Sequence, residues 1–533
     1  MTTGPPHRFE WVVFVLSSAG VLAGLGWLLG AGLVDDTYIF LRYAENIVQG
    51  AGAVFNTGER VDGFSSDAWT LLLAAVRLFT ARMESAALAL SVASALGVIV
   101  VVYYVLRRAR VDAPDRWTSV VLALGLLSLP ATVYWAFAGM EHPLFTLAVT
   151  ATLASAMADD RHDMVSFRTA VLLVLAVVTR PEGVLLVAWV TVFSSFRHGA
   201  VDRHWFRFIA LPIGGAVAAF GILSVAHLAY FGSMVPNTFY AKVIPNTWDR
   251  LGGGAFYLQR SVVAHAPVLL LAVALYSVAW KLALVPAVPV AFLGGWIGLW
   301  SVYIEYAGGD HFGMFRFFLP VLPACVLLIG LLWGALRGHL RPVWTSGFPA
   351  IVAAAFVLSI VGGMWIDGYK ARMEPIGAQD WGKAGRWIAE NTPPNTLVAT
   401  NVIGAIGYFS RRRIVDMAGL VDPVVAREGA VFTGAAPGHA RYHTDYIFQR
   451  APDLVVYWTS GEVGVPPFTP IRKLKPPWHF SLIHFVLDPR CAERYEHVSV
   501  PLADGSWVEM QKKRTFHLPP GYLAMRSDFP QPQ

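Results

Sequence analysis

Residues 11–44 read WVVFVLSSAGVLAGLGWLLGAGLVDDTYIFLRYA. The apolar run over 11–33 is long enough to cross a bilayer, which takes about 20 residues of helix. Two adjacent carboxylates, Asp35 and Asp36, follow it directly. The stretch therefore predicts a membrane-spanning helix that ends at a pair of acidic side chains, and a polytopic membrane fold if similar runs recur.

The composition is that of an integral membrane protein. Hydrophobic residues make up 56% of the 533 residues and charged residues 14%, against about 25% charged residues in soluble domains, and the mean hydropathy is +0.52. Two cysteines exclude a disulfide-stapled fold. The net charge of +6 follows the loops of the membrane topology, so no nucleic-acid partner is expected.

Similar apolar runs recur along the first two thirds of the chain. They lie at 85–106, 117–136, 142–158, 207–230, 261–280, 283–304, 315–336 and 347–366. The stretch 169–196 is interrupted by Arg180-Pro181-Glu182-Gly183, which predicts two short helices meeting at a turn. Residues 67–81 are short and contain Arg77, which favours a re-entrant or interfacial helix. We expect about 11 transmembrane helices.

Basic residues orient these helices, because short cytoplasmic loops collect Lys and Arg. With the N-terminus inside, the cytoplasmic segments contain Arg107, Arg108, Arg110, Arg116, Arg161, Arg168, Arg197, Arg203, Lys281, Arg337 and Arg341. The pattern predicts a transmembrane domain over 1–367, with a first outer loop at 34–66. The tail, 368–533, is predicted to lie outside the cytoplasm.

The tail is mixed and polar, which indicates a separate soluble domain. Residues 381–391 predict an amphipathic helix, and the runs at 396–400, 413–417 and 453–458 predict short strands. This order favours an α/β or α+β domain.

Asp35 and Asp36 admit two interpretations. Adjacent carboxylates at a membrane boundary repel each other, so one can serve as a proton acceptor, or the pair can hold a cation. The alternative is a structural role, as a helix cap for residues 37–48.

Further polar side chains fall on the same predicted outer face. They are Glu141 and His142, Glu182, Tyr240 and Lys242, and Asp310, His311 and Arg316. Each alone is explained as a cap, an interfacial hydrogen-bonding group or a snorkelling cation. Together they suit a lipid-linked phosphate donor and a polar acceptor, because a cation can neutralise a leaving phosphate while a carboxylate activates a hydroxyl.

The strings around these residues resemble a known enzyme family. They are 33–44 with 54–64, Gly139-Met140-Glu141, Thr179–Gly183, Val235–Lys242, Gly308–His311 with Arg316, Gly404–Tyr408 and Asp416–Pro423. In this order they resemble GT-C fold glycosyltransferases, in particular the mycobacterial terminal β-(1→2) arabinofuranosyltransferase family and its bacterial relatives.

The resemblance implies a multi-pass enzyme of the bacterial cytoplasmic membrane. It would move a sugar, arabinofuranose first and mannose or another hexose second, from a polyprenyl-phosphate carrier to a cell-envelope glycan or lipid-linked acceptor. Asp35 or Asp36 would be the general base. Lys242, His311 and Arg316 would hold the donor phosphate, and Glu141, Glu182, Asp310 and Tyr240 would contact sugar or acceptor. The resemblance implies no definite cofactor, but some GT-C members use a divalent cation, which the Asp pair would tolerate.

Two other functions compete with transfer. A transporter or lipid-linked glycan flippase also spans the membrane many times, but the internal repeats and midplane charges typical of transporters are not evident in this sequence. A glycan-binding relative without activity is the other alternative.

Overall fold

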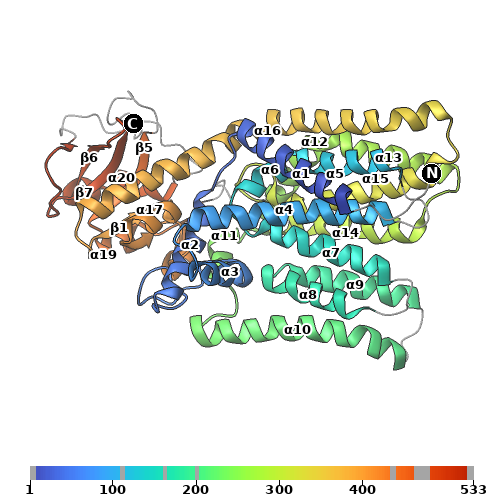
Figure 1. The fold of residues 1–533 in the computed structure, drawn as a ribbon. Coiled ribbons are helices and arrows are strands. Elements are labelled where there is room, and N and C mark those ends of the chain that lie inside the picture. The colour runs from blue at the N-terminus through green and yellow to red at the C-terminus, as the bar shows by residue number, and fades with distance from the viewer. Residues whose placement is uncertain are drawn as a thin grey trace.

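The computed structural model describes residues 8–108, 114–159, 165–198, 203–432, 440–460 and 480–524. A long helical bundle makes up most of the chain, and a sheet-containing unit stands at one end of it (Figure 1). The N-terminal end of the chain lies at the opposite end of the bundle. The start of helix α1 and the sheet-containing unit therefore lie at opposite ends of the bundle.

The helices of the bundle follow the apolar runs. They are α1 (Arg8–Leu29), α4 (Met83–Arg108), α5 (Arg116–Ser128), α6 (Pro130–Phe137), α7 (His142–Asp159), α8 (Phe167–Thr179), α9 (Gly183–His198), α10 (Arg203–Phe231), α12 (Thr247–Ala264), α13 (Ala266–Lys281), α14 (Ala287–Ala307), α15 (Leu322–Arg337) and α16 (Pro342–Asn391). Between them lie α2 (Asp35–Val48), α3 (Asp67–Arg77), α11 (Asn237–Lys242) and the 3₁₀ helix η1 (Arg316–Val321).

Six helices in the described parts of the chain are long and apolar enough to cross a membrane, or up to eight if each bent pair is one span. The expected total of about 11 therefore stays a prediction. Helices α8 and α9 are shorter apolar helices on either side of the predicted break at Arg180–Glu182. Helix α3 has 11 residues, about 16 Å of helix, which is too short to cross alone.

Two predicted spans are bent rather than straight. The run 117–136 forms α5 and α6 with a 58° bend, and 261–280 falls on α12 and α13 with a 78° bend. Pro130 begins α6, and Pro267 lies in the first turn of α13. Proline lacks the N–H that would continue the preceding helix, which explains a break at each position.

The C-terminal unit is a mixed sheet with short helices. Its elements are β1 (Leu397–Thr400), α17 (Ile403–Ser410), β2 (Arg413–Asp416), α18 (Pro423–Glu428), β3 (Ala430–Val431), β4 (Arg441–Tyr442), α19 (Thr444–Arg450), β5 (Leu454–Ser460), α20 (Phe480–Leu487), α21 (Pro489–Arg494), β6 (Tyr495–Pro501), β7 (Trp507–Lys513) and β8 (Leu523–Ala524). The main sheet has the order β2-β1-β5-β7-β6-β8. β1 pairs in parallel with β2 and β5, and the other neighbours are antiparallel.

One helix joins the two units. Helix α16 runs along the bundle and continues into the sheet-containing unit without interruption (Figure 1). The predicted domain boundary at 367/368 therefore falls inside a helix. The apolar pattern ends near this point, whereas the helix itself continues to Asn391.

Candidate functional site

Asp35 and Asp36 begin helix α2 and make different contacts. The two carboxylate oxygens of Asp35 accept hydrogen bonds from the backbone N–H groups of Gly404 (3.0 Å) and Ala405 (2.8 Å). These donors belong to the first turn of α17, whose N–H groups have no partner within their own helix. Asp35 therefore ties the first outer loop to the C-terminal unit.

The Asp36 carboxylate faces two cations. Its Oδ2 lies 3.8 Å from Lys242 Nζ and 3.9 Å from Arg316 Nη1. Among the described residues Asp36 makes no side-chain hydrogen bond, and its side chain is 15% exposed. Asp36 is therefore the member of the pair whose oxygens remain available to another molecule.

Arg316 is already paired with a second acid. Its Nη2 donates to Asp310 Oδ1 at 2.8 Å, and its Nε contacts Asp310 Oδ2. The guanidinium also lies over the ring of Phe312, 4.5 Å from the ring centroid. Asp310, expected to contact the sugar or acceptor, thus serves as the ion-pair partner of Arg316.

Lys242 differs from Arg316 because its closest acid is 3.8 Å away. Burial lowers the pKa of Lys242, and the nearby Asp36 carboxylate opposes that shift. Of the three groups predicted to hold a phosphate, Lys242 is the cation with no direct hydrogen bond in the described chain. His311 lies beside Asp310, with Nδ1 3.5 Å from Asp310 Oδ1.

Glu141 and Glu182 share one arginine that the sequence interpretation did not assign to the site. Arg180 Nη1 bonds Glu141 Oε1, and Arg180 Nη2 donates to Glu182 Oε1 at 2.9 Å. Tyr303 donates its hydroxyl proton to the same Glu182 oxygen at 2.7 Å. The position of Arg180, next to proline in the middle of an apolar run, was the available signal.

Two further polar side chains surround the Glu141 carboxylate. His142 Nε2 lies 3.0 Å from Arg180 Nη1, and Ser65 donates to Glu141 Oε1 at 3.4 Å. Glu141 is fully buried, and its second oxygen, Oε2, has no hydrogen-bond partner within the described residues. A polar ligand group with a proton to donate would satisfy that oxygen.

Tyr240 lies on the side of α11 that meets the C-terminal unit. The Arg427 guanidinium of α18 stands over its ring, 4.5 Å from the centroid. Asn237, in the same short helix, donates to the carbonyls of Gly419 (2.8 Å) and Leu420 (3.1 Å). The segment Pro236-Asn237-Thr238 thus joins the two units. A contact of Tyr240 with sugar or acceptor stays a prediction.

Burial raises the pKa of Asp35 to about 7, although the N–H groups of Ala405 and Gly404 favour its ionised form and the neighbouring Asp36 disfavours it. A carboxyl group poised near neutrality is a typical candidate for a general base. The contacts oppose that role here, because both oxygens of Asp35 are already occupied.

The contacts also bear on a divalent cation. The described residues contain no group of three His, Cys, Asp or Glu side chains placed to hold a metal ion. The Asp35 oxygens face α17 while Asp36 faces two cations, so the pair offers no shared set of ligands. The divalent cation stays a prediction from the sequence.

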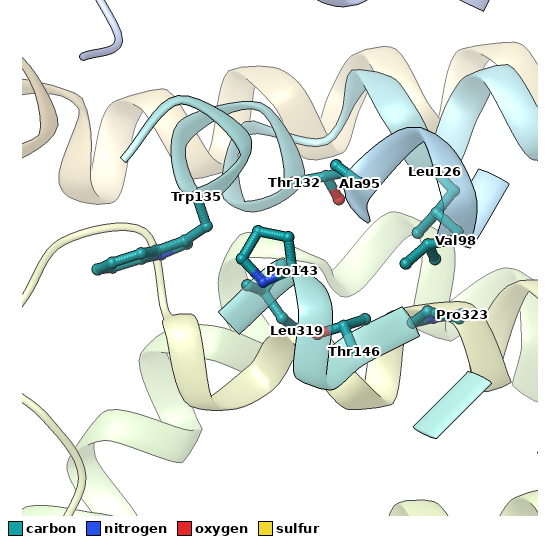
Figure 2. Close-up of a pocket in the computed structure, with 9 residues that line it drawn as sticks. All are labelled: Ala95, Val98, Leu126, Thr132, Trp135, Pro143, Thr146, Leu319 and Pro323. Atoms are coloured by element: carbon teal, nitrogen blue, oxygen red, sulfur yellow. The ribbon is translucent and has the colours of Figure 1, made fainter. Parts of the chain in front are cut away.

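A small pocket of about 20 Å³ lies inside the helical bundle (Figure 2). Trp135 lines it, and the same indole ring has the Arg316 guanidinium carbon 5.6 Å from its centroid. The other lining side chains are apolar apart from Thr132 and Thr146. A sugar needs several hydrogen-bonding partners. The polar side chains around Asp36 and Glu141 are therefore a better candidate site than this pocket.

The chain is similar to known proteins in sequence and in fold. Residues 366–512 match a domain of unknown function, DUF8728. The terminal β-(1→2)-arabinofuranosyltransferase of Mycobacterium tuberculosis is 29% identical over 261 residues, which are 46% of this chain and 40% of that protein. The enzyme of the same name from Corynebacterium glutamicum is 30% identical over 146 residues, 26% of this chain and 20% of that protein. The matches thus span less than half of the length of these curated relatives.

Solved structures match nearly the whole chain. ArnT from Cupriavidus metallidurans, bound to undecaprenyl phosphate, has a TM-score of 0.55 at 16% identity, covering 96% of this chain and 99% of ArnT. An oligosaccharyltransferase from Archaeoglobus fulgidus, tethered to an acceptor peptide, has a TM-score of 0.57 at 12% identity, covering 97% of this chain and 76% of that chain. The chain has the GT-C fold. In this GT-C chain Asp36, Lys242 and Arg316 form a group, the Asp36 cluster. It lies where α2, α11 and η1 meet.

Proposed function

We propose that the protein is an inverting glycosyltransferase that takes a sugar from a polyprenyl-phosphate carrier. The observation that carries the proposal is the Asp36 carboxylate, which faces Lys242 and Arg316 at 3.8 and 3.9 Å and has no hydrogen bond among the described residues. A carboxylate with available oxygens next to cations combines a base for a hydroxyl with a site for a phosphate.

The reaction follows from this arrangement. Asp36 takes the proton of the acceptor hydroxyl, and the acceptor oxygen forms a bond to the anomeric carbon from the face opposite to the phosphate. The bond between the anomeric carbon and the phosphate oxygen breaks, and polyprenyl phosphate leaves with the electron pair. Lys242 and Arg316 neutralise the charge that develops on the leaving phosphate.

The surrounding groups have defined tasks in this scheme. Arg316 is oriented by Asp310, whereas Lys242, whose closest acid is 3.8 Å away, gains a direct partner when the donor phosphate binds. The Glu141 oxygen without a partner accepts a hydroxyl of the sugar or the acceptor. His311 and Tyr240 are secondary candidates for the phosphate and the acceptor.

The transferred sugar is proposed as arabinofuranose, and mannose or another hexose is the second candidate. The names of the two curated relatives support arabinofuranose, and the undecaprenyl phosphate bound to ArnT supports a polyprenyl-phosphate carrier. We place the reaction on the outer face of the bacterial cytoplasmic membrane, with a cell-envelope glycan or lipid-linked acceptor. The N-terminus is then cytoplasmic and the C-terminal unit extracytoplasmic.

The test compares adjacent residues. Purified wild type, Asp36→Asn and Asp35→Asn are incubated in detergent with synthetic polyprenyl-phosphoryl arabinose and a short arabinan acceptor. We expect Asp36→Asn to lose turnover while it still binds the donor and melts like wild type. Asp35→Asn, the matched control, should lose thermal stability and retain measurable turnover.

Each outcome has a defined meaning. Full turnover by Asp36→Asn overturns the assignment of the base. Turnover of a mannosyl donor but not of the arabinosyl donor changes the sugar and leaves the mechanism in place. Absence of transfer in detergent combined with lipid-linked glycan movement across vesicles would support a flippase instead, because transport needs two compartments and transfer does not.

A further inference from the structure

The connection between α14 and η1, residues 308–315, has a backbone conformation that its sequence does not favour. Gly308 and Gly309 have positive φ, which glycine adopts freely. Met314 (φ 56°) and Phe315 (φ 49°) are also left-handed, and each such residue costs about 1–2 kcal/mol unless its surroundings hold it. Arg316, a member of the Asp36 cluster, is the next residue along the chain.

Two carboxylates of helix α16 hold this connection in place. Glu374 Oε1 accepts the N–H of Gly313 at 3.0 Å, and Asp367 Oδ2 accepts the N–H of Met314 at 2.8 Å. The two acids are seven residues apart, so they lie on the same face of the helix. Trp135 Nε1 donates to the Met314 carbonyl at 3.0 Å, so both backbone polar groups of Met314 are bound.

Both acids are themselves oriented by other helices. Tyr134 donates its hydroxyl proton to Glu374 Oε2, and Arg260 Nη2 donates to Asp367 Oδ1 at 2.8 Å. In the described chain neither acid forms an ion pair with Lys242 or Arg316, the two cations of the Asp36 cluster. Their hydrogen bonds to the N–H groups of Gly313 and Met314 are their direct contacts with the segment that precedes Arg316.

We propose that Asp367 and Glu374 are positioning residues that fix the left-handed pair Met314–Phe315 and thereby set where the Arg316 guanidinium stands relative to Asp36. The proposal rests on the proposed function, because it assumes that Arg316 faces the donor phosphate. Its specific consequence is that these two acids control the donor and not the acceptor.

The chemistry of the two acids gives a matched pair of variants. Glutamine at 374 keeps an oxygen for the Gly313 N–H, and its amide group can donate to the Tyr134 oxygen, which also accepts hydrogen bonds. Asparagine at 367 has one oxygen for two donors, the Met314 N–H and Arg260, and neither donor can accept in return. Glu374→Gln should therefore be tolerated, whereas Asp367→Asn and Glu374→Ala should not.

The full-length protein in detergent is assayed for undecaprenyl-phosphate binding, for kcat and KM with donor and acceptor separately, and for thermal unfolding. We expect Asp367→Asn and Glu374→Ala to lower kcat/KM for the donor by up to about 100-fold, the typical cost of a misplaced group. Undecaprenyl-phosphate affinity should fall as well, while the acceptor KM stays unchanged. Glu374→Gln and Glu390→Ala, an exposed acid on the same helix, should match wild type.

Several results would overturn the proposal. One is a lower melting temperature in Asp367→Asn and Glu374→Ala with unchanged donor kcat/KM and lipid affinity, which shows a purely structural role. Equal losses for donor and acceptor also contradict it. If Glu374→Ala does not fold, Asp367→Asn carries the test. If the wild type binds no undecaprenyl phosphate, the proposed function itself is overturned. If the wild type and both variants bind it equally, only the positioning role is overturned.

Discussion

Gly404 packs directly against the main chain of Asp35, and a Cβ at position 404 would stand 1.9 Å from the Asp35 carbonyl oxygen. Gly404 lies in the first turn of α17, where alanine is normally the better helix former by about 1 kcal/mol. The clash is with backbone and cannot be relieved by a rotamer change. We therefore expect Gly404→Ala to destabilise the protein by about 3 kcal/mol, the upper part of the range for overpacking.

Thermal unfolding in detergent measures this change, and Gly338→Ala is the control. Gly338 ends α15, and no atom lies within 4 Å of the position that its Cβ would occupy. The control should unfold at the wild-type temperature. A Gly404→Ala variant as stable as wild type would show that α17 does not dock against Asp35.

The contribution of Asp35 to the stability of the protein should fall as pH rises from about 4 to about 7. Burial raises the pKa of Asp35 from 3.8 to about 7, so the folded protein keeps a proton that the unfolded chain has already lost in this interval. A folded state that binds more protons than the unfolded state loses stability with rising pH. Below about pH 4 and above about pH 7 this contribution is constant.

The Asp35→Asn variant isolates the contribution of Asp35, because Asp416 in the C-terminal unit also has its pKa raised to about 7 by burial. The difference in free energy of unfolding between wild type and variant is measured at pH 4, 5.5 and 7. It should shift steadily in favour of the variant as pH rises. A difference that does not change with pH would contradict the raised pKa.

The sequence predicts local features of this fold well. Apolar length locates the helices, and the interruption at Arg180–Glu182 predicts the turn between α8 and α9. The strands expected at 396–400, 413–417 and 453–458 correspond to β1, β2 and β5. These features depend on periodicity and on residues close together in the chain, which the sequence displays directly.

Pairings between distant segments could not be predicted. Adjacent residues on a helix point about 100° apart, so nothing local tells that Asp35 faces α17 while Asp36 faces Lys242. Sequence position likewise does not tell that Glu141 and Glu182 meet on Arg180, or that Asp367 and Glu374 bind a loop some 60 residues earlier. The polar residues were found by their chemistry, but their partners depend on the tertiary fold.

Replacing the Asn56 amide by a carboxylate should lower the stability of the protein. Its Oδ1 accepts the N–H of Ile414 (2.9 Å), and its Nδ2 donates to the Ile414 carbonyl and to Glu59 Oε2, both at 2.8 Å. Asn56→Asp replaces that donor by a buried oxygen facing a carbonyl and a carboxylate. We expect a loss of about 1–2 kcal/mol in unfolding free energy, because the unpaired and repelling buried groups outweigh the stronger bond from Arg42 Nη2, which lies 3.3 Å from Oδ1.

Chemical denaturation of Asn56→Asp and of the exposed control Asn395→Asp measures this effect. The control should stay within about 0.5 kcal/mol of wild type, as surface substitutions usually do. Equal stability of the two variants would contradict the docking of the first outer loop on β2.

Arg180 should be required for folding because of the charges it neutralises, and for transfer because of the groups it orients. Arg180→Met leaves the buried Glu141 and Glu182 carboxylates without a cation, and breaking a buried ion pair from one side typically costs about 3–5 kcal/mol.

The triple variant Arg180→Met, Glu141→Gln, Glu182→Gln removes the uncompensated charges. It should recover most of the thermal stability, because Tyr303 can still donate to an amide oxygen at 182. Transfer should remain absent in the triple variant, since no guanidinium then orients the side chains at positions 141 and 182. Recovery of both stability and transfer would show that the Arg180 cluster is structural and that the reaction depends on the Asp36 group alone.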